Sequence, residues 1–254
     1  MKFLQAFFVQ LRQAVSWPLA LCALLLALMA ELGVAGMLAG DRQILSVWYL
    51  AQSSGAGLLT LFVLPTLPFA MSLAGDWESR ALPYWVAREG VARYTVSKLL
   101  ASAAAGFLTV GLGLGLFVLV NGAFLPWYAS CSSVDYEAFF EKGQILLGWL
   151  CYMLHMALSG ALIGALGMFT SILVPNRFVA VSAPLAIHLT VIRIMPTRMI
   201  SPISIWHPIN WVEGLHHTSS PWLTLLGKFL LTAGFCLLMC IAGALWMKRR
   251  FERG

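Results

Sequence analysis

Six apolar runs occupy most of this 254-residue chain, and each is close to the length needed to cross the hydrocarbon core of a bilayer. They cover residues 17–39, 55–74, 96–120, 145–174, 178–194 and 223–247. Only 10% of the residues are charged, whereas a soluble domain carries about 25%. The polar stretches between the runs are too short to bury a core of their own. We therefore predict an all-α membrane protein with six transmembrane helices and a single transmembrane domain, residues 1–254.

The first fifteen residues predict a separate amphipathic helix before the first span. Apolar side chains recur there at helical spacing, and polar side chains lie off that face. The apolar set is Phe3, Leu4, Phe7, Phe8, Leu11 and Val15. We predict an interfacial helix over residues 1–15, and a simple extension of the first transmembrane helix is the alternative.

Lys and Arg residues fall into two sets that alternate along the chain. The larger set holds Lys2, Arg12, Arg80, Arg88, Arg93, Lys98, Arg177, Lys248, Arg249, Arg250 and Arg253. The smaller set holds Arg42, Lys142, Arg193, Arg198 and Lys228. Because cytoplasmic loops carry the excess of positive charge, this asymmetry predicts that both termini are cytoplasmic.

Glycine and proline mark packing and bending positions within the spans. Gly111 and Gly115 in the third span, and Gly160 in the fourth with its partner at 164, form GxxxG pairs. Such pairs let helix backbones approach closely, and we predict packing within the chain. Pro65 and Pro68 predict a break or kink in the second span, which in transporters often lines a pathway.

The most unusual polar segment separates the second and third spans, over residues 75–98, and holds seven charged residues. Within it Leu82, Trp85, Val86 and Glu89 fall at helical spacing. A helix there would present an aromatic and apolar surface to a cytoplasmic partner. The alternative is an ordinary solvated loop that carries positive-inside residues.

This segment resembles the one between the second and third spans of ABC-2 type transporter permeases. Glu78, Leu82, Arg93 and Lys98 follow that family's pattern, while 79–81 replaces its usual Gly-Thr pair and Gly90 stands where a Pro is common. Residues 201–215 are similar to the family's extracellular segment, in which short re-entrant helices precede the last span. The resemblance covers essentially the whole chain and implies an ABC-2 (type V exporter-like) architecture, with a possibly re-entrant region at 196–221.

The resemblance implies the permease subunit of an ATP-binding cassette exporter in the bacterial cytoplasmic (inner) membrane. Its substrate would be hydrophobic or amphipathic, such as an antimicrobial peptide, drug or lipid, with a role in antibiotic resistance or immunity. The sequence has no G-x-x-x-x-G-K-[ST] motif, so ATP and Mg²⁺ would bind to a separate ATPase subunit. We expect no catalytic residue, metal or cofactor on this chain, and no nucleic-acid partner. A second permease chain and membrane lipids complete the expected partners.

The cytoplasmic coupling helix region, residues 76–94, would then contact the ATPase. The residues we predict for this contact are Glu78, Arg80, Leu82, Trp85, Arg88, Glu89 and Arg93.

Polar residues inside the spans are candidates for the substrate pathway, because burying charge in lipid is costly. The set is Glu31, Pro65, Pro68, His155, His188 and Arg193. An ion pair between Glu31 and Arg193 and a relay between His155 and His188 are possible. The simpler alternatives are contact of both charged residues with water or headgroups, and a lone histidine that is hydrogen-bonded inside the bundle.

The best alternative function is a proton-coupled secondary transporter that uses Glu31 and His155. Such transporters often contain an inverted repeat, and none is visible. An intramembrane zinc protease would need H-E-x-x-H, which is missing. A haem or metal role for His207, His216 and His217 is weakly indicated, because the last two are adjacent and do not share a helix face.

Overall fold

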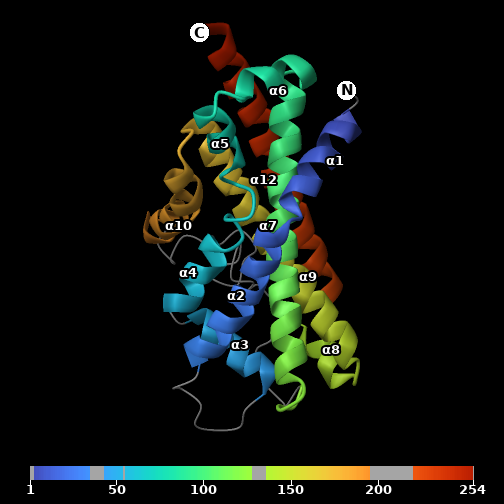
Figure 1. The fold of residues 1–254 in the computed structure, drawn as a ribbon. Coiled ribbons are helices and arrows are strands. Elements are labelled where there is room, and N and C mark those ends of the chain that lie inside the picture. Colours follow the sequence, from blue (N-terminus) through green and yellow to red (C-terminus); the bar gives the residue numbers. More distant parts are fainter. Residues whose placement is uncertain (1–2, 35–42, 54, 128–135, 195–219, 254) are drawn as a thin grey trace.

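The computed structural model describes residues 3–34, 43–53, 55–127, 136–194 and 220–253, drawn in Figure 1 as a bundle of helices. Over these ranges the chain is helical and contains no strand, as the sequence predicts. The helices are α1 (Phe3–Ala14), α2 (Trp17–Val34), α3 (Ile44–Ser53), α4 (Gly55–Val63), α5 (Ser72–Glu78), α6 (Leu82–Glu89), α7 (Val91–Asn121), α8 (Glu137–Glu141), α9 (Ile145–Leu173), α10 (Arg177–Ile194) and α12 (Pro221–Arg253).

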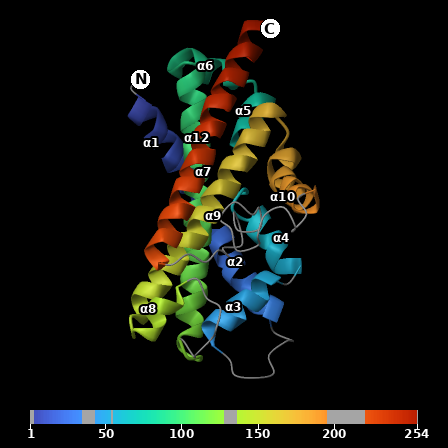
Figure 2. The same cartoon turned by 180° about the vertical axis from the view of Figure 1, so that it is seen from behind.

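The three longest helices, α7, α9 and α12, are each long and apolar enough to cross a membrane. They pack against one another at the centre of the bundle, and α2 packs on α7 while α10 packs on α9 (Figures 1 and 2). A helix satisfies its backbone hydrogen bonds internally, which is what the bilayer core demands. The described part of the chain therefore has the structure of a helical membrane protein.

The crossing of α7 and α9 depends on small residues. A Cβ atom on Gly106 would lie 2.2 Å from the carbonyl oxygen of Gly160, and one on Gly164 would lie 2.4 Å from the carbonyl oxygen of Ser102. The Ser102 hydroxyl also donates a 2.8 Å hydrogen bond to the Gly164 carbonyl. The 160/164 pair thus packs within the chain as predicted, although its partners on α7 are residues 102 and 106 rather than the 111/115 pair.

The N-terminal segment forms a helix of its own. α1 and α2 are bent by 52° relative to each other, and together they count as a fourth candidate span. α1 packs on α7 through Ala6, Gln10 and Ala14, whereas the apolar side chains of Leu4 and Phe8 stay exposed. The buried face of α1 thus consists of two alanines and a glutamine, and its larger apolar side chains remain on the outer surface.

The second apolar run is broken, as its two prolines predict. α4 ends at Val63 and α5 begins at Ser72, with turns between them that contain Pro65 and Pro68. Proline has no backbone N–H to donate and its ring clashes with the preceding turn, so a helix cannot continue undisturbed through two of them. This break gives α5 a direction of its own at the end of the bundle.

The fourth and fifth apolar runs form a tight hairpin of α9 and α10. Asn176 is the N-cap of α10. Its side-chain oxygen accepts hydrogen bonds from the backbone N–H groups of Phe178 at 2.8 Å and Val179 at 3.3 Å. α10 contains Pro184 and belongs to the shorter apolar helices. The predicted re-entrant region 196–221 lies almost entirely outside the described residues.

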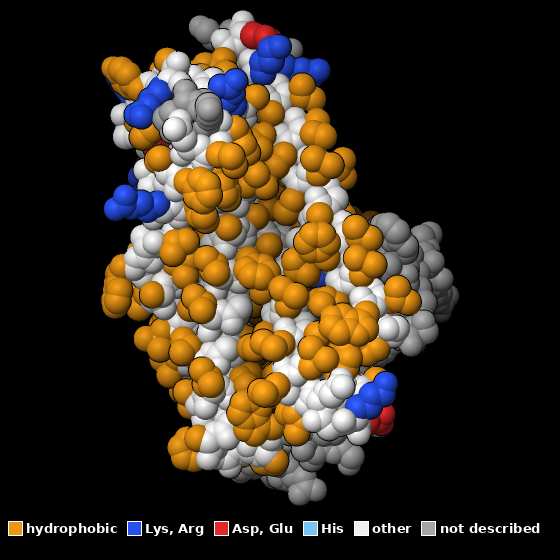
Figure 3. Space-filling model, turned by 90° about the vertical axis from the view of Figure 1, so that its right-hand side faces the viewer, with side chains coloured by type: hydrophobic (Ala, Val, Ile, Leu, Met, Phe, Trp, Pro, Cys, Tyr) orange, Lys and Arg blue, Asp and Glu red, His pale blue; other side chains and the backbone are white. Residues whose placement is uncertain are grey.

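Charge is concentrated at one end of the molecule. Figure 3 shows Lys and Arg side chains gathered there, above a flank covered by apolar side chains. The start of α1, the end of α12 and the whole of α6 lie at this same end in both ribbon views (Figures 1 and 2). We call it the α6 end.

Candidate functional site

A short elbow at the α6 end joins α5 to α6. After Glu78 the chain turns through three residues, and the backbone N–H of Ala81 donates a 2.9 Å hydrogen bond to the carbonyl of Asp76. Arg80 in this turn has φ 58°, and among the described residues it is the one non-glycine residue in the left-handed region. That conformation costs a non-glycine residue roughly 1–3 kcal/mol, so the surrounding contacts hold the turn in place.

A buried ion pair fixes α5 to α7. The Lys98 ammonium lies 2.8 Å from a carboxylate oxygen of Asp76, and their side chains are only 3% and 22% exposed. The same oxygen accepts a 2.5 Å hydrogen bond from the Tyr94 hydroxyl, and Lys98 donates to the Ser72 hydroxyl at 3.0 Å. The Lys98 ammonium also lies 5.0 Å from the centre of the Phe69 ring. We call Asp76, Tyr94, Lys98 and Ser72 the α5–α7 lock.

Two further contacts hold α5 from the outside. Arg177, at the start of α10, forms a 2.7 Å ion pair with Glu78, with both side chains about half exposed. The guanidinium of Arg250, on α12, lies 4.5 Å from the centre of the Trp77 ring. Exposed ion pairs contribute only about 0–1 kcal/mol to the unfolding free energy. The Arg177–Glu78 pair therefore adds little to the attachment of α5, which depends mainly on the buried α5–α7 lock.

α6 is the helix that its spacing predicts, but its predicted contact face is turned inward. Leu82 and Glu89 are buried, and Trp85 and Val86 pack partly against the core beside α7. We correct the prediction on this point, because Leu82 and Glu89 are covered by the chain's own bundle.

The outward face of α6 carries side chains that the prediction left out. It is formed by Pro83, Tyr84 and Ala87 together with Arg88, and the Tyr84 side chain is 80% exposed. Of the predicted contact residues, Glu78, Arg80, Arg88 and Arg93 are exposed. The ATPase contact itself stays a prediction.

Glu89 is a buried acid at the inner end of α6. The residue is 3% exposed, and neither carboxylate oxygen has a hydrogen-bond partner within the described residues. Burial raises the pKa of this carboxyl above its ordinary value, while the nearby charges of Arg88 and Lys98 act in the opposite direction. Glu89 therefore carries a proton more readily than an exposed glutamate does.

A cleft opens beside the elbow at the surface. It has a volume of about 510 Å³ and is lined by Trp77, Glu78, Arg80, Leu82, Pro83 and Phe251. The cleft thus joins the end of α5, the start of α6 and the end of α12. Its mixture of apolar, cationic and anionic side chains suits a protein surface better than a small molecule.

The polar residues predicted inside the spans have other partners than expected. Asn121 donates a hydrogen bond to the Glu31 carboxylate, and no ion pair joins Glu31 to Arg193. Of the two alternatives given from the sequence, the Glu31–Arg193 ion pair is therefore not formed. Arg193 is exposed near the end of α10.

The two histidines of the predicted relay have different neighbours. A nitrogen of the buried His155 ring lies 2.9 Å from the Tyr136 hydroxyl, within hydrogen-bond distance. The His188 ring lies against Phe62, with the ring centres 4.6 Å apart. His155 thus matches the alternative of a histidine bonded inside the bundle, and the roles of both in a pathway stay predictions.

Two features were missed from the sequence. Lys228, counted with the cations of the smaller set, is fully buried within α12. Its position seven residues into an apolar helix was the available signal. The pairing of Asp76 with Lys98 was also missed. The 21 residues between them contain the elbow and α6, and their path through space is set only when the chain folds.

The geometry defines a class: a helical membrane protein with a short amphipathic helix at one end of its bundle, beside a buried ion pair that joins α5 to α7. No family model matches the chain, and no curated protein or solved structure matches it either. Within the described ranges there is also no cluster of three or more His, Cys, Asp or Glu side chains that could hold a metal ion.

Proposed function

We propose that this chain is the membrane-spanning permease subunit of an ATP-binding cassette exporter. It would move a hydrophobic or amphipathic compound, such as an antimicrobial peptide, a drug or a lipid, out of a bacterial cell. A separate ATPase subunit supplies the energy. The observation that carries this proposal is the placement of α6, an amphipathic helix at the end of the bundle whose inner face is packed and whose outer face is open.

The outer face of α6 suits the contact with the ATPase. Tyr84 and Arg88 project from it, and Arg80 lines the adjoining cleft. Tyrosine and arginine are enriched where protein surfaces meet, because each combines a large contact area with hydrogen bonding. The cleft offers a seat for a side chain or helix end of the ATPase.

The inner face of α6 suits transmission into the bundle. Leu82 and Glu89 are buried against the bundle, so a displacement of α6 moves side chains that touch the spans. At one end α6 continues through Gly90 into α7, and at the other it continues through the elbow into α5. Nucleotide-driven motion of the ATPase would in this way reach two helices at once.

The proposal includes six spans with both termini in the cytoplasm. α1 would lie in the membrane interface, α4 and α5 would form one broken span, and α10 would be the fifth. Support comes from the excess of Lys and Arg at the α6 end, which the positive-inside rule assigns to the cytoplasm (Figure 3). Two such chains would assemble with two ATPase chains in the inner membrane.

Co-purification with an ATPase tests the proposal. The chain is purified with any P-loop ATPase that binds to it, and ATP hydrolysis is measured in proteoliposomes. We expect a stable complex in which the double variant Tyr84→Ala/Arg88→Ala lowers hydrolysis or uncouples it from transport. The control is Phe124→Ala, which removes an equally exposed aromatic ring at the opposite end of α7.

A different result would favour the secondary transporter. If the chain binds no ATPase and a proton gradient alone drives transport through it, the exporter proposal is wrong. If the complex forms but the double variant behaves like Phe124→Ala, the outer face of α6 is not the contact.

A further inference from the structure

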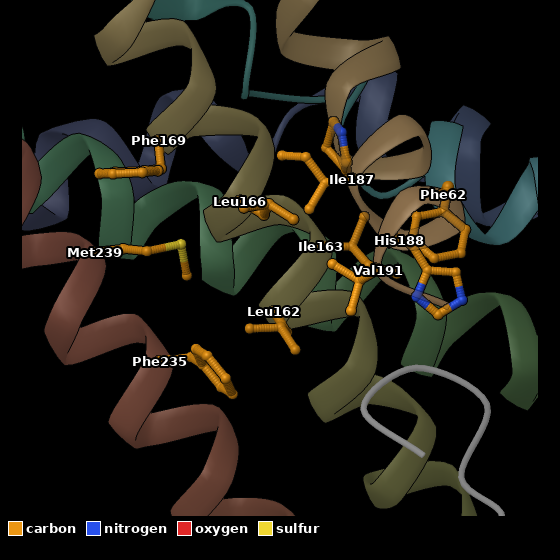
Figure 4. A pocket seen from close by; sticks show the side chains of 11 residues that line it. Phe62, Leu162, Ile163, Leu166, Phe169, Ile187, His188, Val191, Phe235 and Met239 are labelled. Atoms are coloured by element: carbon orange, nitrogen blue, oxygen red, sulfur yellow. The ribbon is translucent and has the colours of Figure 1, made fainter. Parts of the chain in front are cut away.

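A pocket lies between α10 and α12, with α9 as its floor. α9 packs against both neighbours, and the pocket occupies the wedge between them, with Phe62 of α4 at one end (Figures 2 and 4). Its volume is about 190 Å³. Figure 4 shows Leu162 and Leu166 pointing into it from α9, and Phe235 and Met239 facing it from α12.

The chemistry of this pocket is almost purely apolar. Its lining side chains present carbon and sulfur, apart from the His188 ring, which lies against Phe62. Among the described residues that line it there is no Lys, Arg, Asp or Glu. An apolar cavity of about 150 Å³ lined by Leu, Ile and Phe stays dry and accepts a small hydrocarbon such as benzene. The α10–α12 pocket is of that kind and slightly larger.

The position of the pocket along the helices indicates which part of a bilayer would surround it. Phe235 and Met239 lie near the middle of α12, and Leu162 and Leu166 lie in the inner part of α9, well away from the ends of both helices. The flanks beside the pocket are apolar and exposed, at Leu237 and Leu238 on α12 and at Ile187 on α10. In a bilayer, that depth and those flanks face hydrocarbon chains rather than headgroups.

We propose that this pocket binds the terminal part of one acyl chain of a bilayer phospholipid. An empty pocket forfeits dispersion contacts along all of its walls, and among its described lining residues only the His188 ring offers water a hydrogen-bond partner, so a hydrocarbon chain is the occupant that restores the contacts. The lipid headgroup stays at the interface and takes no part in recognition. This inference does not depend on whether the chain works with an ATPase.

Photolabelling in nanodiscs tests the proposal. The chain is reconstituted in phosphatidylcholine with a small fraction of phosphatidylcholine whose acyl chain carries a terminal diazirine, then irradiated, and the labelled peptides are identified by mass spectrometry. We expect several-fold more label on the α10 and α12 residues that line the pocket than on Leu112, an apolar residue of α7 that is 50% exposed and lies away from the ends of that helix. Replacement of the host lipid by phosphatidylglycerol should leave the pattern unchanged.

Filling the pocket provides the decisive comparison. Val191→Trp places a large ring among the lining side chains, and we expect it to lower the pocket labelling several-fold. Val120→Trp makes the same substitution on the exposed flank of α7 and should leave the labelling unchanged. If Val191→Trp is poorly folded by gel filtration, Ile187→Trp serves as the second filling variant. Labelling that merely follows exposure, that depends on the headgroup, or that persists when the pocket is filled overturns the proposal.

Discussion

Asp76→Asn is the substitution that most directly tests the α5–α7 lock. It removes the negative charge but keeps the size and shape of the side chain. The Lys98 ammonium, whose side chain is 3% exposed, then faces a neutral amide instead of a carboxylate at 2.8 Å. Because Lys98 has little access to water, it cannot replace the lost partner by solvation.

The expected magnitude follows from that burial. Removal of one partner of a buried ion pair costs about 3–5 kcal/mol of unfolding free energy, because it leaves an uncompensated charge. Glu78→Gln is the control two residues away, since it breaks the half-exposed pair with Arg177 and should cost about 0–1 kcal/mol. Both variants remove one negative charge from the same short helix, but the Asp76 pair is buried and shares its oxygen with the Tyr94 hydroxyl, whereas the Glu78 pair is half exposed.

Reversible unfolding in mixed micelles of detergent and sodium dodecyl sulfate measures both costs. The double variant Asp76→Asn/Lys98→Met should recover most of the stability lost by Asp76→Asn, because it removes the orphaned charge as well. Equal costs for Asp76→Asn and Glu78→Gln would refute the assignment of the lock as a buried pair. A double variant no more stable than the single one would refute the explanation by an unpaired Lys98.

Two further predictions concern packing and protonation. Gly160→Ala puts a Cβ atom 2.4 Å from the Gly106 carbonyl oxygen and should destabilise the purified chain by about 1–3 kcal/mol. Gly115→Ala is the control, because the nearest neighbour of its Cβ atom is a sulfur atom 3.9 Å away, and it should be nearly neutral. Equal shifts of the two variants in thermal unfolding would contradict the close crossing of α7 and α9. Because the pKa of Glu89 is raised, the folded state binds the carboxyl proton of Glu89 more tightly than the unfolded state does. The contribution of Glu89 to the unfolding free energy is therefore greatest below the unfolded-state pKa of about 4.3, and it is lost as the pH rises through the raised pKa of the folded state. Glu89→Gln should remove that decline in stability measured across pH, and an unchanged profile would contradict the role of Glu89.

Most of the helices could be predicted from the sequence, because they follow from an apolar run or an amphipathic spacing and its breakers, whereas α3 and α8 lie outside the predicted elements. Two prolines end α4, Asn176 begins α10, and Gly90 separates α6 from α7, all by local chemistry. The boundaries of α9 and α10 agree with the predicted spans to within a residue. Local signals of this kind act within a few residues of the feature that they specify.

The faces and partners of these helices could not be predicted in the same way. The spacing of Leu82, Trp85 and Glu89 defines one face of α6, but spacing alone does not say whether that face meets the chain's own bundle or another protein. Likewise a pair of small residues indicates a close contact without naming the partner, so Gly160 meets Gly106 instead of Gly111. Both choices depend on the register of whole helices, which the entire bundle sets.

The two connections of α6 differ in stiffness, and this difference bears on how a displacement would travel. On the α5 side the turn is closed by hydrogen bonds to Asp76, which the lock also holds, and it keeps Arg80 in a strained conformation. On the α7 side a single residue, Gly90, makes the joint with φ 84°, and no atom lies within 4 Å of the position of its missing Cβ. We therefore expect motion of α6 to be passed mainly to α5. Because the two prolines already interrupt the helix beyond α5, α5 can tilt without moving α4, and the α5–α7 lock would then set how far it tilts.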